Sequence, residues 1–156
     1  MDDIVTNKAK GELRIQGKRL VALDAEALCR HLDALVGRTV SEVIIRNHEF
    51  HLGKEDAERY RKENPKASLE QILERVKTSD RLGGFGLSEF TIKQDKSVLV
   101  EIGNPCVKET SGAASALLFG YCCGLFSYYF GLEYDAVDVR FNEQKNIVSA
   151  RLLPRS

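Results

Sequence analysis

The sequence has no net charge, because its 23 lysine and arginine residues are balanced by 23 aspartate and glutamate residues. A protein that binds nucleic acid through phosphate contacts needs an excess of basic side chains, so this balance argues against a dedicated DNA- or RNA-binding protein. Hydrophobic residues make up 43% of the chain and charged residues 29%, which excludes the composition of a disordered or collagen-like protein. The composition is that of a globular protein and identifies no reaction.

Cysteine is scarce, and its four positions lack the even spread through loops that is typical of secreted, disulfide-bonded domains. Cys122 and Cys123 are adjacent in an apolar stretch, and Cys29 and Cys106 lie far from them. We therefore expect reduced thiols that are buried as small hydrophobic residues.

The first residues are acidic and no apolar run follows them, whereas a secretory signal needs both basic residues and such a run. We therefore expect a cytoplasmic protein.

The length of 156 residues fits one domain, which we place at residues 1–156 with a frayed polar segment at 1–10. Short strands are expected around Gly17, where apolar and charged residues alternate loosely. Between residues 82 and 105 the spacing of apolar residues changes from helical to alternating, which predicts two strands joined by a turn. A second pair of strands is expected between residues 132 and 153.

Apolar residues at helical spacing predict three helices in the first half of the chain. The first begins after Asp24 and ends at Gly37, and the third begins with a capping box at Ser68. The second begins near Ser41 and fades within the charged run 54–63. Its stripe consists of Val40, Val43, Ile44, His48, His51 and Leu52. We predict an α+β fold, in which an antiparallel sheet of two hairpins packs against the N-terminal helices and a long central buried helix.

The segment 111–131 is the candidate for this central helix. It contains no charged residue and holds three of the five tyrosines and three of the seven phenylalanines. A membrane-spanning helix needs about 20 apolar residues, so the length alone does not exclude a span. Glycines and hydroxyl-bearing residues interrupt the segment, however, and no basic cluster adjoins either end, so we expect no contact with a membrane. A helix that is apolar on all sides is instead expected between a sheet and other helices.

Four small residues recur every four positions in this segment: Gly112, Ala116, Gly120 and Gly124. On a helix this spacing forms a ridge of small residues, along which another backbone can approach closely. Glycine inside a helix costs about 1 kcal/mol relative to alanine, so the ridge indicates a packing or an access requirement. The ridge either packs against a neighbouring helix or leaves a slot beside the aromatic side chains, which an apolar small molecule can enter.

Three stretches of the sequence carry a resemblance to a known family. They are Arg81-Leu82-Gly83-Gly84-Phe85-Gly86, Gly103-Asn104-Pro105-Cys106, and the segment from Phe119 to Glu133 with its Gly-Tyr-x-x-Gly-x-x-Ser pattern. Together they resemble the 4-vinyl reductase domain, a small-molecule-binding module related to the Bet3-type subunits of a vesicle-tethering complex. The resemblance covers roughly residues 20–153. It implies an α+β domain that dimerises through its helices and holds a hydrophobic ligand between helices and sheet.

The sequence departs from this family at the positions where many relatives hold zinc. Those relatives use three cysteines and a glutamate, and the corresponding residues here are Ser115, Asp138, Phe141 and Ser149. Phenylalanine and serine do not supply the thiolates that a tight tetrahedral zinc site needs. We therefore expect no metal at this place, and we predict no cofactor.

The resemblance implies that the second helix lines the ligand cavity. Combined with the aromatic segment 111–131, it predicts a ligand site formed by His48, His51, Leu52, Tyr121, Leu125 and Phe126. His48 and His51 also have a spacing that suits two metal ligands, but they lack the zinc protease pattern and a third ligand. We interpret them as half-buried polar anchors at one end of the cavity, and His31 as solvated.

We predict no catalytic residue. Cys122 and Cys123 point about 100° apart on a helix, and no basic residue lies nearby in sequence to lower a thiol pKa, so inert thiols are favoured over a redox pair. Cys106 is better placed for exposure, but a nucleophile would need a histidine beside it. The glycines of 83–86 do not open a helix and lack the lysine of a phosphate loop, which argues against a nucleotide site.

Three functions remain open at the level of sequence. The first, which the uncharged aromatic segment favours, is binding of an apolar or aromatic small molecule by a homodimeric sensor or carrier. The second is an accessory or catalytic role in the reduction of a tetrapyrrole vinyl group, for which a partner would have to supply electrons, since no Rossmann glycine pattern or iron–sulfur cysteine set is present. The third is an interaction scaffold like the Bet3-type subunits.

Overall fold

The computed structural model describes residues 4–7, 12–15, 18–20 and 24–155, and it describes side chains from Asp24 onward. Its elements in chain order are β1 (Ile4–Asn7), β2 (Glu12–Ile15), β3 (Lys18–Leu20), α1 (Ala25–Val36), α2 (Arg38–Glu63), α3 (Leu69–Gly83), β4 (Leu87–Ile92), β5 (Val98–Gly103), α4 (Gly112–Phe130), β6 (Tyr134–Asn142) and β7 (Ile147–Pro154).

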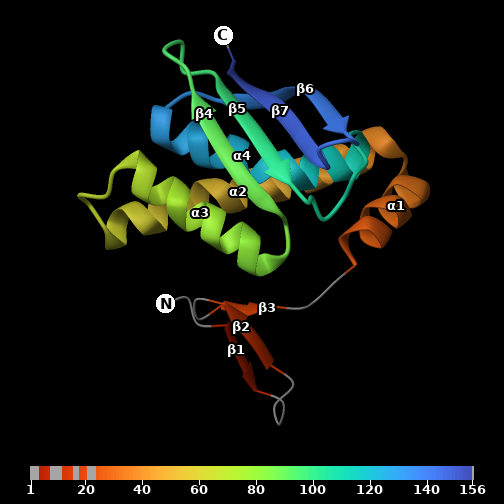
Figure 1. Cartoon of the computed structure of the whole chain (residues 1–156), viewed down its shortest axis with the longest axis horizontal. Helices are drawn as coiled ribbons and strands as arrows, with labels where there is room; N and C mark the ends of the chain where they lie inside the picture. The colour runs from red at the N-terminus through yellow and green to blue at the C-terminus, as the bar shows by residue number, and fades with distance from the viewer. Residues whose placement is uncertain (1–3, 8–11, 16–17, 21–23, 156) are drawn as a thin grey trace.

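Four strands form an antiparallel sheet in the order β4-β5-β7-β6. Each predicted hairpin supplies two neighbouring strands, and β5 pairs with β7 to join the hairpins, with Val100 opposite Ala150. α4 lies against this sheet and α2 lies beyond α4 (Figure 1). The predicted α+β class, with an antiparallel sheet of two hairpins and a long central helix, is confirmed.

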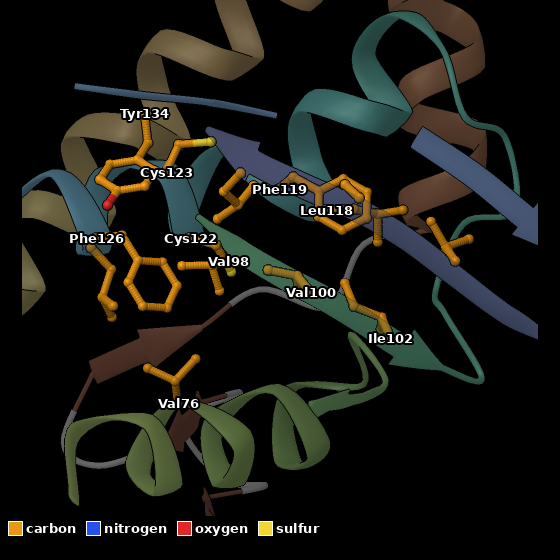
Figure 2. Packing of buried hydrophobic residues seen from close by; sticks show 14 of the residues in the cluster. Val76, Val98, Val100, Ile102, Leu118, Phe119, Cys122, Cys123, Phe126 and Tyr134 are labelled. Atoms are coloured by element: carbon orange, nitrogen blue, oxygen red, sulfur yellow. The ribbon is translucent and has the colours of Figure 1, made fainter. Parts of the chain in front are cut away.

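The central helix α4 is buried over most of its length. Alternate residues of β5 point toward it, and Figure 2 shows the side chains of Val98, Val100 and Ile102 at this contact. Phe119 and Phe126 of α4 are fully buried there. Among the described helices, α4 is the one that is long and apolar enough to cross a membrane, and 67% of its most apolar window is buried inside the fold. This burial is typical of a core helix.

Helices α2 and α4 touch backbone to backbone. A Cβ atom on Gly124 would lie 1.9 Å from the carbonyl oxygen of Phe50, and a Cβ atom on Gly53 would lie 2.0 Å from the carbonyl oxygen of Tyr121. A Cβ atom on Gly120 would lie 2.8 Å from a Cβ atom of α2. Only glycine fits at such distances. At Gly120 and Gly124, therefore, the space beside the small-residue ridge is filled by α2.

The inward face of α2 is not its most apolar face. The buried residues of α2 are small or polar and are spaced in multiples of four: Ser41, Glu49, Gly53 and Ala57. Val40, Val43 and Ile44, which belong to the predicted stripe, are 50%, 45% and 50% exposed. The close contact with α4 accounts for this arrangement, because it leaves room only for small side chains between the two helices.

The start of α4 is capped by a side chain from α1. Ser111 occupies the N-cap position without a capping hydrogen bond from its side chain, whereas the amide of Ala113 donates to Asp33 Oδ1 at 3.1 Å. Asp33 also accepts a hydrogen bond from the hydroxyl group of Ser41. Gly112 has a φ of 58°, and a Cβ atom there would lie 2.5 Å from Asp33 Oδ2. The Asp33 carboxylate therefore joins α1, α2 and α4 at one point.

Local sequence signals agree with the boundaries of the other helices. Asp24 caps α1 by accepting a hydrogen bond from the amide of Ala27 at 2.9 Å, and Ser68 and Gln71 form the predicted capping box of α3. α2 differs, since it continues through the charged run to Glu63 instead of fading there. Ion pairs one turn apart support this extension, and Lys62 Nζ lies 2.8 Å from the Glu58 carboxylate.

The N-terminal strands form a second sheet, in the order β1-β2-β3. Of the segment predicted to be frayed, residues 4–7 form β1, and 1–3 and 8–10 lie outside the described residues. The strands predicted around Gly17 correspond to β2 and β3, and Gly17 itself lies outside the described residues.

Candidate functional site

A cavity of about 240 Å³ lies among α2, α3 and α4. Its apolar wall comes from these helices and from the residues next to β4 and on β5: Leu52, Ala57, Ile72, Val76, Phe85, Ile102, Leu117, Leu118, Cys122 and Leu125. Its polar groups are Glu49, Asp56, Arg59, Tyr60, Arg75, Ser79, Asp80 and Tyr121. Such a mixture of an apolar wall and a few polar groups is typical of small-molecule sites.

Helical spacing brings these residues together. On α4, Leu118, Tyr121, Cys122 and Leu125 lie three or four positions apart and therefore share one face, next to the glycine ridge. The ridge is filled by α2, so the cavity forms beside it, where α3 covers the gap between α2 and α4.

Glu49 is the most buried charged side chain of the cavity, with 9% of its surface exposed. Burial raises the pKa of its carboxyl group, and the neighbouring His48 opposes that shift. The ionisable groups of the two residues are 4.0 Å apart, measured between His48 Nε2 and Glu49 Oε1. Within the described part of the chain, the Glu49 carboxyl group accepts no hydrogen bond.

Asp80 faces the cavity from α3. Burial raises the pKa of its carboxyl group from the ordinary 3.8 to about 6, although a hydrogen bond from the Ser88 hydroxyl acts in the opposite direction. That bond joins Ser88 Oγ to Asp80 Oδ2 at 2.5 Å. Asp80 therefore changes its charge close to neutral pH.

Tyr121 lines the same cavity from α4. Burial raises the pKa of this hydroxyl far above its ordinary range, and the charges of Asp56 and Asp80 add to the shift. The group therefore stays neutral at physiological pH. It makes no hydrogen bond within residues 24–155.

The two guanidinium groups in the described lining of the cavity already have partners. Arg59 donates to Asp56 at 2.8 Å, and Arg75 lies over the ring of Tyr60 at 4.6 Å from its centroid. A cation held over an aromatic face is attracted by the ring, so this pair holds α2 and α3 together at the cavity.

The structure brings together three of the six residues predicted for the ligand site. Leu52, Tyr121 and Leu125 line the cavity. His48 and His51 differ from the expectation of half-buried anchors, because both are exposed and neither lines the cavity; the His48 side chain is 71% exposed. The physical reason is the orientation of α2, whose glycine contact with α4 turns the neighbouring positions 49, 52 and 56 inward.

Phe126 also lies apart from the cavity. It packs against Phe90, Phe130 and Tyr134 between α4 and the sheet, on another face of the helix from Tyr121. The four ridge residues do not line the cavity either: Gly120 and Gly124 contact α2, Gly112 lies beside Asp33, and Ala116 is buried.

Sequence reasoning missed the charged residues of the cavity. Glu49 lies three positions before Leu52, and Asp56 and Tyr60 lie four and eight positions after it, but only apolar residues and histidines of this helix were predicted for the site from the sequence. The signal that points to them is Gly53, because a glycine in the middle of a helix marks a close contact and thereby the inward face.

The thiol groups show no sign of activation. Burial raises the pKa of Cys122 and that of Cys123, the latter to about 12. Cys122 lines the cavity, while Cys123 packs in the core cluster. Cys106 is half-buried, and burial raises its pKa as well. Among the described residues, no group of three histidine, cysteine or acidic side chains is placed to hold a metal ion.

The chain has the fold of a known sensory domain. It is similar to the crystal structure of the phenol-responsive sensory domain of the transcription activator PoxR with phenol, with a TM-score of 0.68 and 16% sequence identity. The similarity covers 96% of this chain and 84% of that one. No family model and no curated protein sequence matches the chain. At this identity the likeness shows the fold, and membership of the 4-vinyl reductase family stays a prediction.

Proposed function

We propose that this chain binds a small apolar or aromatic molecule in the cavity among α2, α3 and α4, in the role of a sensor or carrier. The cavity is the observation that carries the proposal, because a concave site of about 240 Å³ with an apolar wall and a few polar groups is the usual form of a small-molecule site. A cavity of about 150 Å³ with an apolar lining binds benzene, so this one has room for a substituted ring or a small fused ring system. The similarity to a phenol-responsive sensory domain supports the same role.

The size of the cavity disfavours a tetrapyrrole. A tetrapyrrole joins four five-membered rings in one molecule and needs several times the volume of benzene, whereas the cavity measures about 240 Å³. A vinyl reductase would also need a group that delivers electrons and protons. The thiol of Cys122, which faces the cavity, has a raised pKa and is a poor nucleophile.

We also propose that the protein is a cytoplasmic homodimer. The α1–α2 apolar surface, which we define as Leu28, Leu35, Val36, Val40, Val43 and Ile44, is exposed. Contiguous apolar patches on soluble proteins commonly mark interfaces. A scaffold of the Bet3 type would use such a surface for a different partner, and it would retain that partner when the cavity is filled.

The test of ligand binding is to fill the cavity. Val76 is 6% exposed and lines the cavity, so Val76→Phe places a ring in the space that the ligand needs. We expect wild-type protein to bind ethylbenzene or phenol in isothermal titration calorimetry and Val76→Phe to lose at least about tenfold in affinity, since a bulky side chain occupies the site.

The control is Leu132→Phe, which adds a ring at an exposed position that neither lines the cavity nor belongs to the α1–α2 apolar surface. Circular dichroism and the unfolding midpoint establish that each variant is folded. Equal affinities of a folded Val76→Phe variant and wild type would show that the ligand binds elsewhere, and no binding of either compound by wild type would contradict the proposed function.

A further inference from the structure

Within residues 24–155, two carboxyl groups of the cavity have no lysine or arginine side chain close enough to compensate their charge. Glu49 on α2 is about nine-tenths buried, and its one possible ion-pair partner within the described residues is the exposed imidazole of His48, at 4.0 Å. Asp80 on α3 accepts a hydrogen bond from Ser88 and forms no ion pair within residues 24–155. Both carboxyl groups act electrostatically on the thiol of Cys122, which places them around the same part of the cavity.

The cationic side chains in the described lining of the cavity do not compensate these two groups. Arg59 is shared between Asp56 at 2.8 Å and Glu63 at 4.0 Å, and Arg75 lies over the ring of Tyr60. The described lining of the cavity thus presents unpaired acidic groups beside an apolar wall. An isolated buried carboxylate is costly, and a cation brought in by a ligand offsets that cost.

Tyr121 adds a third group that is open to a ligand. Its hydroxyl is neutral, makes no hydrogen bond within the described residues and lies close enough to Asp80 for the two to interact electrostatically. A neutral hydroxyl both donates and accepts hydrogen bonds, so it suits an amino group that still has N–H bonds to share.

We propose that the cavity selects small arylalkylamines, whose ring packs against Leu52, Leu118 and Leu125 while the ammonium group lies between Glu49, Asp80 and the hydroxyl of Tyr121. This inference rests on the proposed function, since it assigns a ligand class to the same cavity. Burial raises the pKa of both carboxyl groups, which is the effect expected of an acidic site that waits for a cation. The same acidic groups disfavour a ligand that carries a carboxylate.

The test uses four probes with one ring and similar size: benzylamine, benzyl alcohol, ethylbenzene and benzoate. We expect isothermal titration calorimetry with wild-type protein to give an affinity for benzylamine at least about tenfold above that for ethylbenzene and benzyl alcohol, because a charge-assisted hydrogen bond is worth more than a neutral one. Benzoate should not bind measurably. Equal binding of benzylamine and the two neutral probes would overturn the amine assignment and leave the proposed function standing.

Two variants locate the selectivity. Glu49→Gln and Asp80→Asn keep the shape of each side chain and remove its charge, so each should lower the affinity for benzylamine by about tenfold and leave that for ethylbenzene unchanged. The matched control is Glu58→Gln, a glutamate of α2 that pairs with Lys62 and does not line the cavity. Retained selectivity in both cavity variants would overturn the assignment. If wild type binds none of the four probes, the binding function itself is overturned.

Discussion

At the scale of the residue, Asp33 caps α4 from a distant part of the chain, in the role that the local residue Ser111 would be expected to fill. It lies 80 positions before Ala113, yet its carboxylate accepts the hydrogen bond from that amide at the start of α4. Ser111, which has the residue type and position of an N-cap, makes no such bond. A sequence motif for a cap describes local contacts, so it cannot reveal a carboxylate that the tertiary fold brings from another helix.

We predict that Asp33→Ala lowers the free energy of unfolding by about 1–3 kcal/mol, because it removes the cap of α4 and leaves the buried Ser41 hydroxyl without this acceptor. Urea denaturation measures the change. The control Ser111→Ala should stay within about 0.5 kcal/mol of wild type. Similar losses in the two variants would contradict the capping role of Asp33.

Asp80 makes stability depend on pH in a defined direction. Its pKa rises from 3.8 to about 6 on folding, so its ionisation costs stability as pH rises through this window, and the cost is absent below pH 4. Asp80→Asn, which retains an acceptor for Ser88, should therefore be about 2–3 kcal/mol more stable than wild type at pH 7.5 and equally stable near pH 4. Urea denaturation across this range checks the prediction.

Asp95→Asn is the contrasting variant, because hydrogen bonds from Ser97 lower the pKa of Asp95. Its stability relative to wild type should fall as pH rises, in the opposite direction to Asp80→Asn. If the difference in free energy of unfolding between Asp80→Asn and wild type did not change with pH, burial would not raise the pKa of Asp80 as proposed.

At the scale of the element, the contact between α2 and α4 decides which side chains of α2 face the core. Gly124→Ala would place a methyl group 1.9 Å from a backbone oxygen, and neither backbone can yield without the helices moving apart. We expect a loss of more than about 3 kcal/mol in the free energy of unfolding, or no folded protein, by chemical denaturation and circular dichroism.

Gly83→Ala is the matched control within a helix. A Cβ atom there meets only the ring of Phe85, at 3.5 Å, which is an ordinary contact. Because alanine favours helices over glycine, this variant should be neutral or up to about 1 kcal/mol more stable. If both substitutions lowered the free energy of unfolding by similar amounts, the close contact between α2 and α4 would not be the reason that Gly124 is required.

The elements that sequence predicted well are those with local signals. Capping residues and apolar residues at helical spacing mark α1 and α3, alternating apolar residues mark the two hairpins, and α4 is recognisable from its uncharged length. The orientation of α2 escaped prediction, because its inward face is set by contact with a helix far along the chain. Leu52, Tyr121 and Leu125 were predicted because they are apolar or aromatic residues of the two helices that the resemblance places at the cavity, whereas Glu49 and Asp80 are charged and carry no local signal of burial.

At the scale of the whole molecule, the proposed dimer depends on the α1–α2 apolar surface. Ile44 is 50% exposed on this surface, so Ile44→Asp should leave the fold intact and shift the dimer toward monomer by at least about tenfold in dissociation constant. Sedimentation equilibrium measures this shift. The control Leu132→Asp alters an exposed leucine outside that surface and should leave the measured mass of the assembly equal to that of the wild-type dimer. A monomeric wild type at high concentration would refute the dimer.

The glycine crossing also limits how the fold can open around a guest. The middle of α2 lies directly against the backbone of α4 at Phe50 and Gly53, and the start of α2 is tied through Ser41 and Asp33 to the amide of Ala113. These two helices therefore form one fixed wall of the cavity. A molecule larger than the cavity would have to displace the facing wall, which α3 supplies, before it could enter.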